Sequence, residues 1–195
     1  MSLSIAEQNK QFQHQLALQR EAQKIRQYER TIRYRIMTTR FNNETAEQNR
    51  LFRERKKIPN YCVYGTPVQI SNGIIPDTKM IVLEMNNEQN KIIGLGLLLN
   101  RVDGHSYNIY SNPSYNRYYY IGKDRIAREE LSEEEEITMK IFDKLCFEGP
   151  LHSKRGQGLR AFPTKMLYRC LSLKNLEEEL VTMFKKRYQQ IKIPN

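Results

Sequence analysis

Residues 79–100 read KMIVLEMNNEQNKIIGLGLLLN, and this stretch carries the strongest structural signal in the chain. Two runs rich in Ile, Val, Leu and Met, 79–85 and 91–100, are separated by the turn dipeptide Asn86-Asn87. Each run has the length of a strand, and the residues between them are too few to form a helix. The sequence therefore predicts two strands that pair in antiparallel fashion.

Sequence patterns typical of strands continue on both sides of this pair. Turn signals such as Asn72-Gly73 and Asp103-Gly104 separate further short runs rich in Ile, Val and Tyr. Since no helix fits between these runs, they favour an antiparallel sheet that curls on itself. We therefore predict a small antiparallel β-barrel-like middle. The additional predicted strands are 61–64, 67–70, 106–110 and 117–121.

Residues 1–58 predict a basic helical arm, and residues 59–195 predict the domain that contains the barrel-like sheet. No Gly or Pro occurs before Pro59, so we expect a long helix, a break at 38–43 and a second helix over about 44–57. The first helix carries a narrow apolar stripe of coiled-coil type, interrupted by Glu29, and it needs a partner to bury that stripe. The stripe consists of Leu18, Ala22, Ile25, Ile32 and Ile36.

Three helices are predicted near the C-terminus, over 132–147, 163–171 and 175–190. Ser132 with Glu135 forms a capping box at the start of the first of them. Leu176, Leu180 and Phe184 recur at helical spacing and are expected to face inward in the last. The fold class is therefore predicted to be α+β, with an N-terminal helical arm, a barrel-like middle and C-terminal helices.

Positive and negative charges are distributed unevenly along the chain. Residues 1–60 carry 13 Lys and Arg against 6 Asp and Glu, residues 61–149 carry 9 against 13, and residues 150–195 carry 10 against 3. Two basic flanks around a mildly acidic middle, with a net charge of +10, favour a polyanionic partner, most often a nucleic acid.

The basic loop 152–160 is the best single candidate for a site. It reads HSKRGQGLR, so two glycines accompany the cations Lys154, Arg155 and Arg160. Phosphate binding uses this combination of free backbone N–H groups and positive charge. A solvated connector whose glycines only permit a tight turn is the alternative reading.

Tyrosines provide a second candidate. Arg117, Tyr118 and Tyr120 stand in a run in which Tyr118 and Tyr120 share one face of a strand. Aromatic rings interleaved with Arg stack on nucleic-acid bases. Alternatively, tyrosine serves here only as a good strand former at half-buried positions.

Arginines of the helical arm form the third candidate. Arg26, Arg30, Arg33 and Arg35 lie within three turns, and such a concentration of charge neutralises phosphates in nucleic-acid-binding proteins. The alternative, left open by the sequence, is an arm that docks on another protein with its arginines solvated.

No pattern predicts a cofactor, a metal site or a catalytic centre. Gly94-Leu95-Gly96 lies in an apolar run, but Leu99 occupies the place of the third glycine of a dinucleotide-binding fingerprint, so we interpret these glycines as a bulge or a barrel corner. The His and Cys residues lack the spacing of metal ligands. The protein is therefore predicted to be neither an enzyme nor a cofactor-binding protein.

Three widely spaced Cys do not make a disulfide framework, which favours a reducing, intracellular compartment. No apolar run approaches the roughly 20 residues that a membrane helix requires, and the first residues lack the features of a signal peptide. We therefore expect no membrane partner.

The segments MIVLEM, KIIGLGLLLN and YYYIGKDRI, within residues 80–126, resemble the strand pattern of the PUA-like superfamily. This resemblance to its ASCH and EVE domains implies a small β-barrel that binds RNA or modified bases. The chain has no Trp, so the Trp cage of the related YTH domains does not carry over. Its Asn- and Tyr-rich texture is also similar to that of uncharacterised proteins of large double-stranded DNA viruses, which would imply a host-cell or virion-interior location.

From these observations we expect a non-enzymatic protein that binds DNA or RNA. The arm and the loop 152–160 would bind phosphates, and the tyrosine run would stack on bases. The alternative is a minor capsid or scaffold-type protein of a large DNA virus particle, whose N-terminal helices dock on other virion or assembly proteins.

Overall fold

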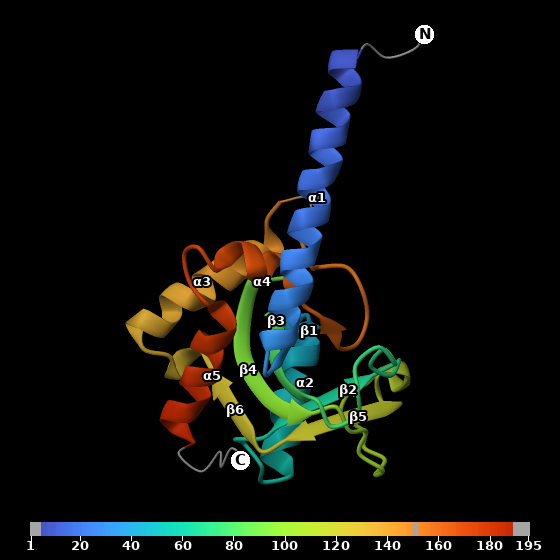
Figure 1. Cartoon of the computed structure of the whole chain (residues 1–195). Helices are drawn as coiled ribbons and strands as arrows, with labels where there is room; N and C mark the ends of the chain where they lie inside the picture. Colours follow the sequence, from blue (N-terminus) through green and yellow to red (C-terminus); the bar gives the residue numbers. More distant parts are fainter. Residues whose placement is uncertain (1–4, 150–151, 189–195) are drawn as a thin grey trace.

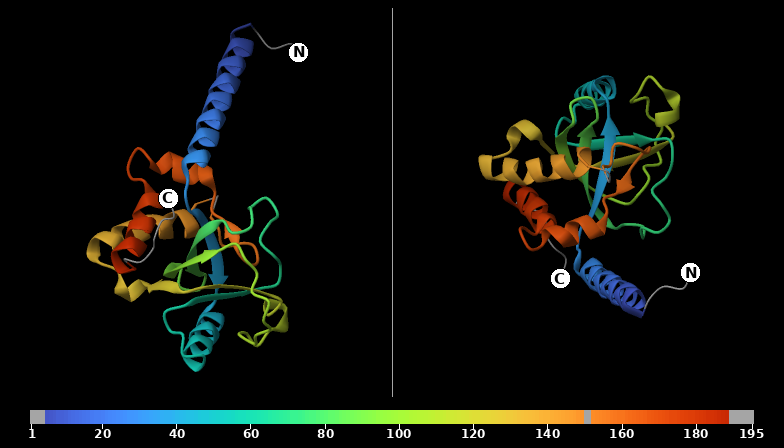
Figure 2. Two further views of the ribbon diagram at one scale, coloured as in Figure 1. Left: turned by 60° about the horizontal axis from the view of Figure 1, so that its bottom comes forward. Right: turned by 90° about the horizontal axis from the view of Figure 1, so that it is seen from above.

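The computed structural model describes residues 5–149 and 152–188 and has an α+β fold built in three layers (Figures 1 and 2). Helices α3 (Glu133–Phe147), α4 (Thr164–Cys170) and α5 (Leu176–Arg187) cover one face of a five-stranded sheet. A two-stranded sheet and α2 (Asn43–Arg55) cover the other face. Helix α1 (Ile5–Thr31) projects from this body (Figure 1).

The five-stranded sheet has the order β6-β4-β3-β1-β7. Its centre is the antiparallel pair β3 (Lys79–Asn86) and β4 (Lys91–Leu99), as predicted. Strand β1 (Arg35–Phe41) pairs with β3 in parallel, so the prediction of a purely antiparallel sheet is wrong. The edges are the short strands β6 (Asp124–Ala127) and β7 (Arg160–Ala161), which the sequence did not predict.

The second sheet pairs β2 (Cys62–Thr66) with β5 (Tyr118–Gly122), close to two of the predicted strands. The segments 67–70 and 106–110 form no strand; their apolar residues Ile70 and Ile109 are buried in the apolar cluster on the side of the second sheet. The main sheet is open and β2–β5 packs across it as a separate sheet, so "barrel-like" fits only loosely.

The predicted N-terminal helices are partly confirmed. The second one is α2, which begins with a capping box between Asn42 and Thr45. The first helix ends at Thr31, whereas the predicted apolar stripe of that helix continued to Ile36. Residues 35–41 form β1 rather than helix and a break, because Ile36, Met37 and Phe41 are buried in the sheet on both of its faces. Division of the chain at residue 58 remains a prediction.

The C-terminal helices are confirmed. The Ser132–Glu135 capping box opens α3, and α5 buries the predicted Leu176, Leu180 and Phe184. The predicted end of the last helix at residue 190 lies outside the described residues; the described part of that helix ends at Arg187.

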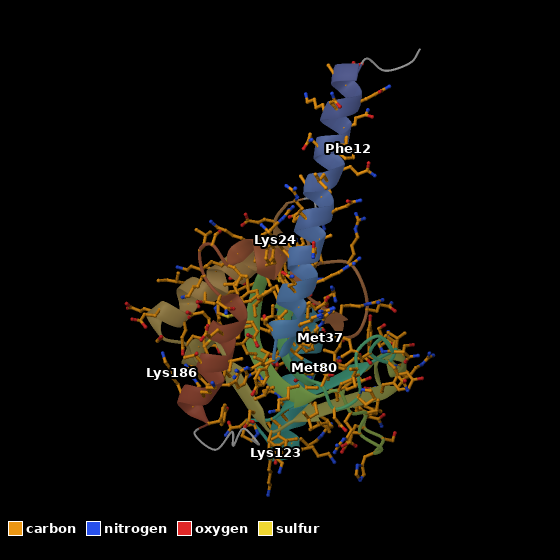
Figure 3. The ribbon with its side chains drawn as sticks, in the orientation of Figure 1. Phe12, Lys24, Met37, Met80, Lys123 and Lys186 are labelled. Atoms are coloured by element: carbon orange, nitrogen blue, oxygen red, sulfur yellow. The ribbon has the colours of Figure 1, made fainter. Side chains whose placement is uncertain are left out.

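Two apolar clusters lie on opposite faces of the main sheet. Leu83 of β3 packs toward the helices, where Phe142 and Phe162 meet with ring centroids 5.6 Å apart. Met37 and Met80, labelled in Figure 3, belong to the other cluster, between the two sheets. Full burial of each such side chain stabilises the fold by roughly 1.5–3 kcal/mol.

A buried carboxylate lies on the second cluster's side of the sheet. Glu84 of β3 is 3% exposed, and Arg125 of β6 reaches it with Nη2 2.7 Å from Oε2 and Nε 3.0 Å from Oε1. The Tyr64 hydroxyl of β2 donates to Glu84 Oε1 at 2.9 Å. The three side chains therefore connect both sheets through one charged group.

The glycines of β4 leave the space for these side chains. A Cβ atom on Gly94 would lie 2.5 Å from Glu84 Oε2, and a Cβ on Gly96 would lie 2.6 Å from the Cβ of Cys62 and collide with the Tyr64 hydroxyl. The register of the β3–β4 pair also shifts between Glu84 and Met85, beside Gly94, as a bulge would produce. These glycines are required by close packing rather than by a ligand.

Replacing Gly96 with Ala should therefore destabilise the protein. Overpacking of a filled core typically costs about 1–3 kcal/mol, and here the added methyl would displace Tyr64 from Glu84. Urea unfolding measures this loss. Gly104→Ala is the matched control, since no heavy atom lies within 4 Å of the added Cβ. Equal stability of the two variants would contradict the packing role.

Candidate nucleic-acid interface

The base of α1 is fixed to the body, and the rest of the helix projects into solvent. Arg169 of α4 donates to Glu21 at 2.9 Å, and the rings of Tyr28 and Tyr168 lie 5.9 Å apart. Every side chain from residue 6 to residue 15 is exposed. Phe12 and Lys24, labelled in Figure 3, mark the projecting part and the part nearer the body.

The four predicted arginines of the arm differ in their surroundings. Arg26, Arg30 and Arg33 are exposed and form no salt bridge with any described residue. Arg35 opens β1 and forms a salt bridge of 2.6 Å with Glu29. Three of the four therefore retain an uncompensated charge at the base of α1.

The loop 152–160 lies along the outer edge of β1. Arg160 at its end pairs with Thr38 in the sheet. Arg155 and Arg160 are exposed, whereas the Lys154 ammonium lies 5.9 Å from the centre of the Phe147 ring, and the backbone carbonyl of Lys154 accepts from Asn87. The loop is therefore fastened to the sheet at several points while two of its cations face solvent.

Arg40 of β1, which was absent from the predicted site, lies beneath this loop. Its Nε donates to the carbonyl of Ser153 at 2.7 Å, and its Nη1 is buried without a partner among the described residues. Burial, and secondly the charge of Arg160, lower the pKa of Arg40. Recognition of residues 35–41 as a strand is the signal that could have placed Arg40 beside the loop.

The tyrosine run is mostly structural. Tyr120 is buried and its hydroxyl accepts from the backbone N–H of Ile70 at 3.0 Å, so its ring presents no face to a base. Tyr118 is half-buried and Arg117 is exposed. The expectation that Tyr118 and Tyr120 together offer a stacking surface is wrong for Tyr120, because β5 packs this residue between the two sheets.

A cavity of about 1010 Å³ lies elsewhere, along β4 and the end of β5. Its walls combine Tyr34, Tyr61 and Tyr188 with several cations, of which Lys123 and Lys186 are labelled in Figure 3. The ammonium of Lys79 lies 5.6 Å from the centre of the Tyr34 ring. The sequence did not point to this cavity because its residues come from distant segments.

The described residues contain no group of three His, Cys, Asp or Glu side chains that could hold a metal ion. Burial raises the pKa of the Cys62 and Cys146 thiols to about 12, so neither is poised as a thiolate. None of the described helices combines the length and the apolar character that crossing a membrane requires.

Comparisons with protein-family models, with curated proteins and with solved structures find no match to this chain.

Tyr120→Phe should lower stability by about 1–2 kcal/mol, because the buried N–H of Ile70 loses its acceptor. Tyr118→Phe removes a half-buried hydroxyl that makes no hydrogen bond with the described residues, so it serves as the matched control and should change stability little. Chemical denaturation measures both. A larger loss of stability from Tyr118→Phe would contradict the structural assignment of Tyr120.

Proposed function

We propose that the protein binds nucleic acid without catalysing a reaction. The observation that carries this proposal is the set of uncompensated cations on α1 and the loop 152–160, which converge near β1. Arg33 lies in the linker just before β1, and Arg160 pairs with Thr38 of β1. The five residues from Arg33 to Thr38 span at most about 17 Å, so the two basic segments can contact phosphates of the same nucleic-acid strand.

Lys154, Arg155 and Arg160 add charge from the loop, and its backbone is held by Arg40 and Asn87. Phosphate contacts of this type provide affinity and position, and they carry no sequence information. The proposal therefore predicts binding that is strong at low salt and largely independent of sequence.

Affinity for both a DNA duplex and a single-stranded RNA should fall steeply between about 50 and 200 mM salt. Changing Arg26, Arg30 and Arg33 together to Gln should reduce the slope of log affinity against log salt by about 0.9 for each duplex phosphate that these side chains neutralise. Fluorescence anisotropy with labelled oligonucleotides measures both quantities, and circular dichroism checks that α1 remains helical.

The matched control removes the same charge from the opposite end of the molecule, where α2 and Lys123 lie (Figures 1 and 3). It combines Arg55→Gln, Lys57→Gln and Lys123→Gln, all at exposed positions. If this control lowers the slope as much as the α1 variant, net charge rather than the basic surface explains binding. Absence of binding by the folded protein at low salt would contradict the proposal itself.

A second function is favoured by the projecting part of α1. Phe12 is 62% exposed and Leu18 is 49% exposed on a helix whose first half projects away from the body. Helices gain most of their stability from packing against other elements. This part of α1 is therefore suited to docking on another protein, as in a large assembly such as a virus particle.

If α1 docks on a second copy of the chain, the full chain should associate in a concentration-dependent way in sedimentation experiments. Deletion of residues 1–15 should abolish this association and leave the fold intact, because the contacts of Glu21 and Tyr28 with α4 remain. Deletion beyond residue 34 would remove β1 and is not informative. Phe12→Ser is the point variant that should reproduce the loss; unchanged association in both variants would contradict docking through α1.

A further inference from the structure

A small pocket opens at the carboxyl end of β1, beneath the loop 152–160. Its volume is about 260 Å³. Residues from β1, from the turn after β3, from the loop and from the segment before β5 form its walls. The side chains and glycines used in the argument are Arg40, Asn87, Gly156, Gly158, Tyr110 and Tyr115.

The charges around the pocket are not balanced. A Cβ atom on Gly156 would lie 3.7 Å from Arg40 Cζ and 3.8 Å from Arg160 Nε, so two guanidinium groups flank this glycine. Neither arginine forms a salt bridge within the described part of the chain, and no carboxylate is among the residues that line the pocket. Two adjacent cations without a counter-charge repel each other, and a bound anion would remove this repulsion.

Polar atoms around the pocket also lack partners. Arg40 Nη1 is a buried donor that makes no hydrogen bond with described residues. The backbone N–H groups of Gly156, Gln157 and Gly158 likewise donate to no acceptor among those residues. A buried guanidinium nitrogen without a partner is uncommon in native proteins, and the three backbone N–H groups beside it, on exposed or half-buried residues, are free to donate as well. These donors favour a ligand that accepts hydrogen bonds.

Two glycines of the loop adopt backbone conformations that other residues rarely reach. Gly156 has φ 118° and Gly158 has φ 67°, both in the region that favours glycine. Successive backbone N–H groups in turns with left-handed residues form concave anion-binding sites. Two further bonds hold this loop in place, from Arg40 Nε to the Ser153 carbonyl and from Asn87 Nδ2 to the Lys154 carbonyl.

We propose that this pocket binds one phosphate group of a nucleotide, with the guanidinium of Arg40 and the N–H groups of residues 156–158 as donors and Arg160 as the neighbouring charge. The half-buried ring of Tyr115, 6.2 Å from that of Tyr110, provides an aromatic wall for the sugar or base. This inference deepens the proposed nucleic-acid-binding function and rests on it for the identity of the ligand. The phosphate can belong to the 5′ end of a strand or to a free nucleotide.

Calorimetry and thermal unfolding of the full chain test the pocket. Inorganic phosphate and AMP should each bind and raise the melting temperature relative to sodium chloride at equal ionic strength, because ligands that bind only the folded state stabilise it. Adenosine, which lacks the phosphate, should not. Failure of both phosphate and AMP to bind would overturn the inference.

Arg40→Gln should weaken the binding of AMP about tenfold or more, since it removes a charged hydrogen-bond donor. Arg160→Gln should weaken it less, and because Arg160 is exposed this variant keeps the test valid if Arg40→Gln does not fold. The matched control is Arg55→Gln, an exposed arginine at the end of α2. Equal losses of affinity in Arg160→Gln and Arg55→Gln would contradict a local site.

Oligonucleotides with a 5′-phosphate and a 5′-hydroxyl distinguish the two sources. If the phosphorylated oligonucleotide binds more tightly and Arg40→Gln abolishes this difference, the ligand of the pocket is the 5′ end of a strand. If both oligonucleotides bind equally and AMP binding depends on Arg40, the ligand is a free nucleotide. Binding of AMP without any salt-dependent oligonucleotide binding would reject the proposed function alone. Salt-dependent binding that Arg40→Gln leaves unchanged, without binding of phosphate or AMP, would reject the pocket alone.

Discussion

The fold depends on the accommodation of one buried carboxylate. Glu84 lies in the central strand of the main sheet, and an unpaired charge there would cost several kcal/mol. Arg125 from the edge strand and Tyr64 from the second sheet satisfy it, and Gly94 and Gly96 give them room. The same charged group therefore fixes the register of β6 against β4 and the position of the second sheet across the first.

The sequence predicts the parts of this fold that local chemistry determines. The β3–β4 pair follows from two apolar runs and a turn, and α3 follows from the capping box at Ser132. Strand β1 could not be predicted in this way, because residues 35–41 contain no turn residue and follow a long helical pattern. Their conformation is decided by pairing with β3, a contact between residues 45 positions apart.

The candidate site shows the same division. The exposed cations Arg26, Arg155 and Arg160 were visible as charge along the sequence. The charge of Arg40 was equally visible, but its position beneath the loop was not, because that position depends on the path of β1. For the tyrosine run the sequence predicted too much. Its composition suggested a binding surface, but Tyr120 is packed in the core, where its hydroxyl makes one buried hydrogen bond. Composition thus located the charge, and topology decided which residues are accessible.

The position of β1 between β3 and β7 has a consequence for synthesis of the chain. Thr38 of β1 meets Arg160, 122 residues later, so the short pairing of β1 with β7 forms only after most of the protein has left the ribosome. Until then β1 carries an unpaired edge, which is a template for aggregation. The polar helix α1 lies directly before that strand in the chain.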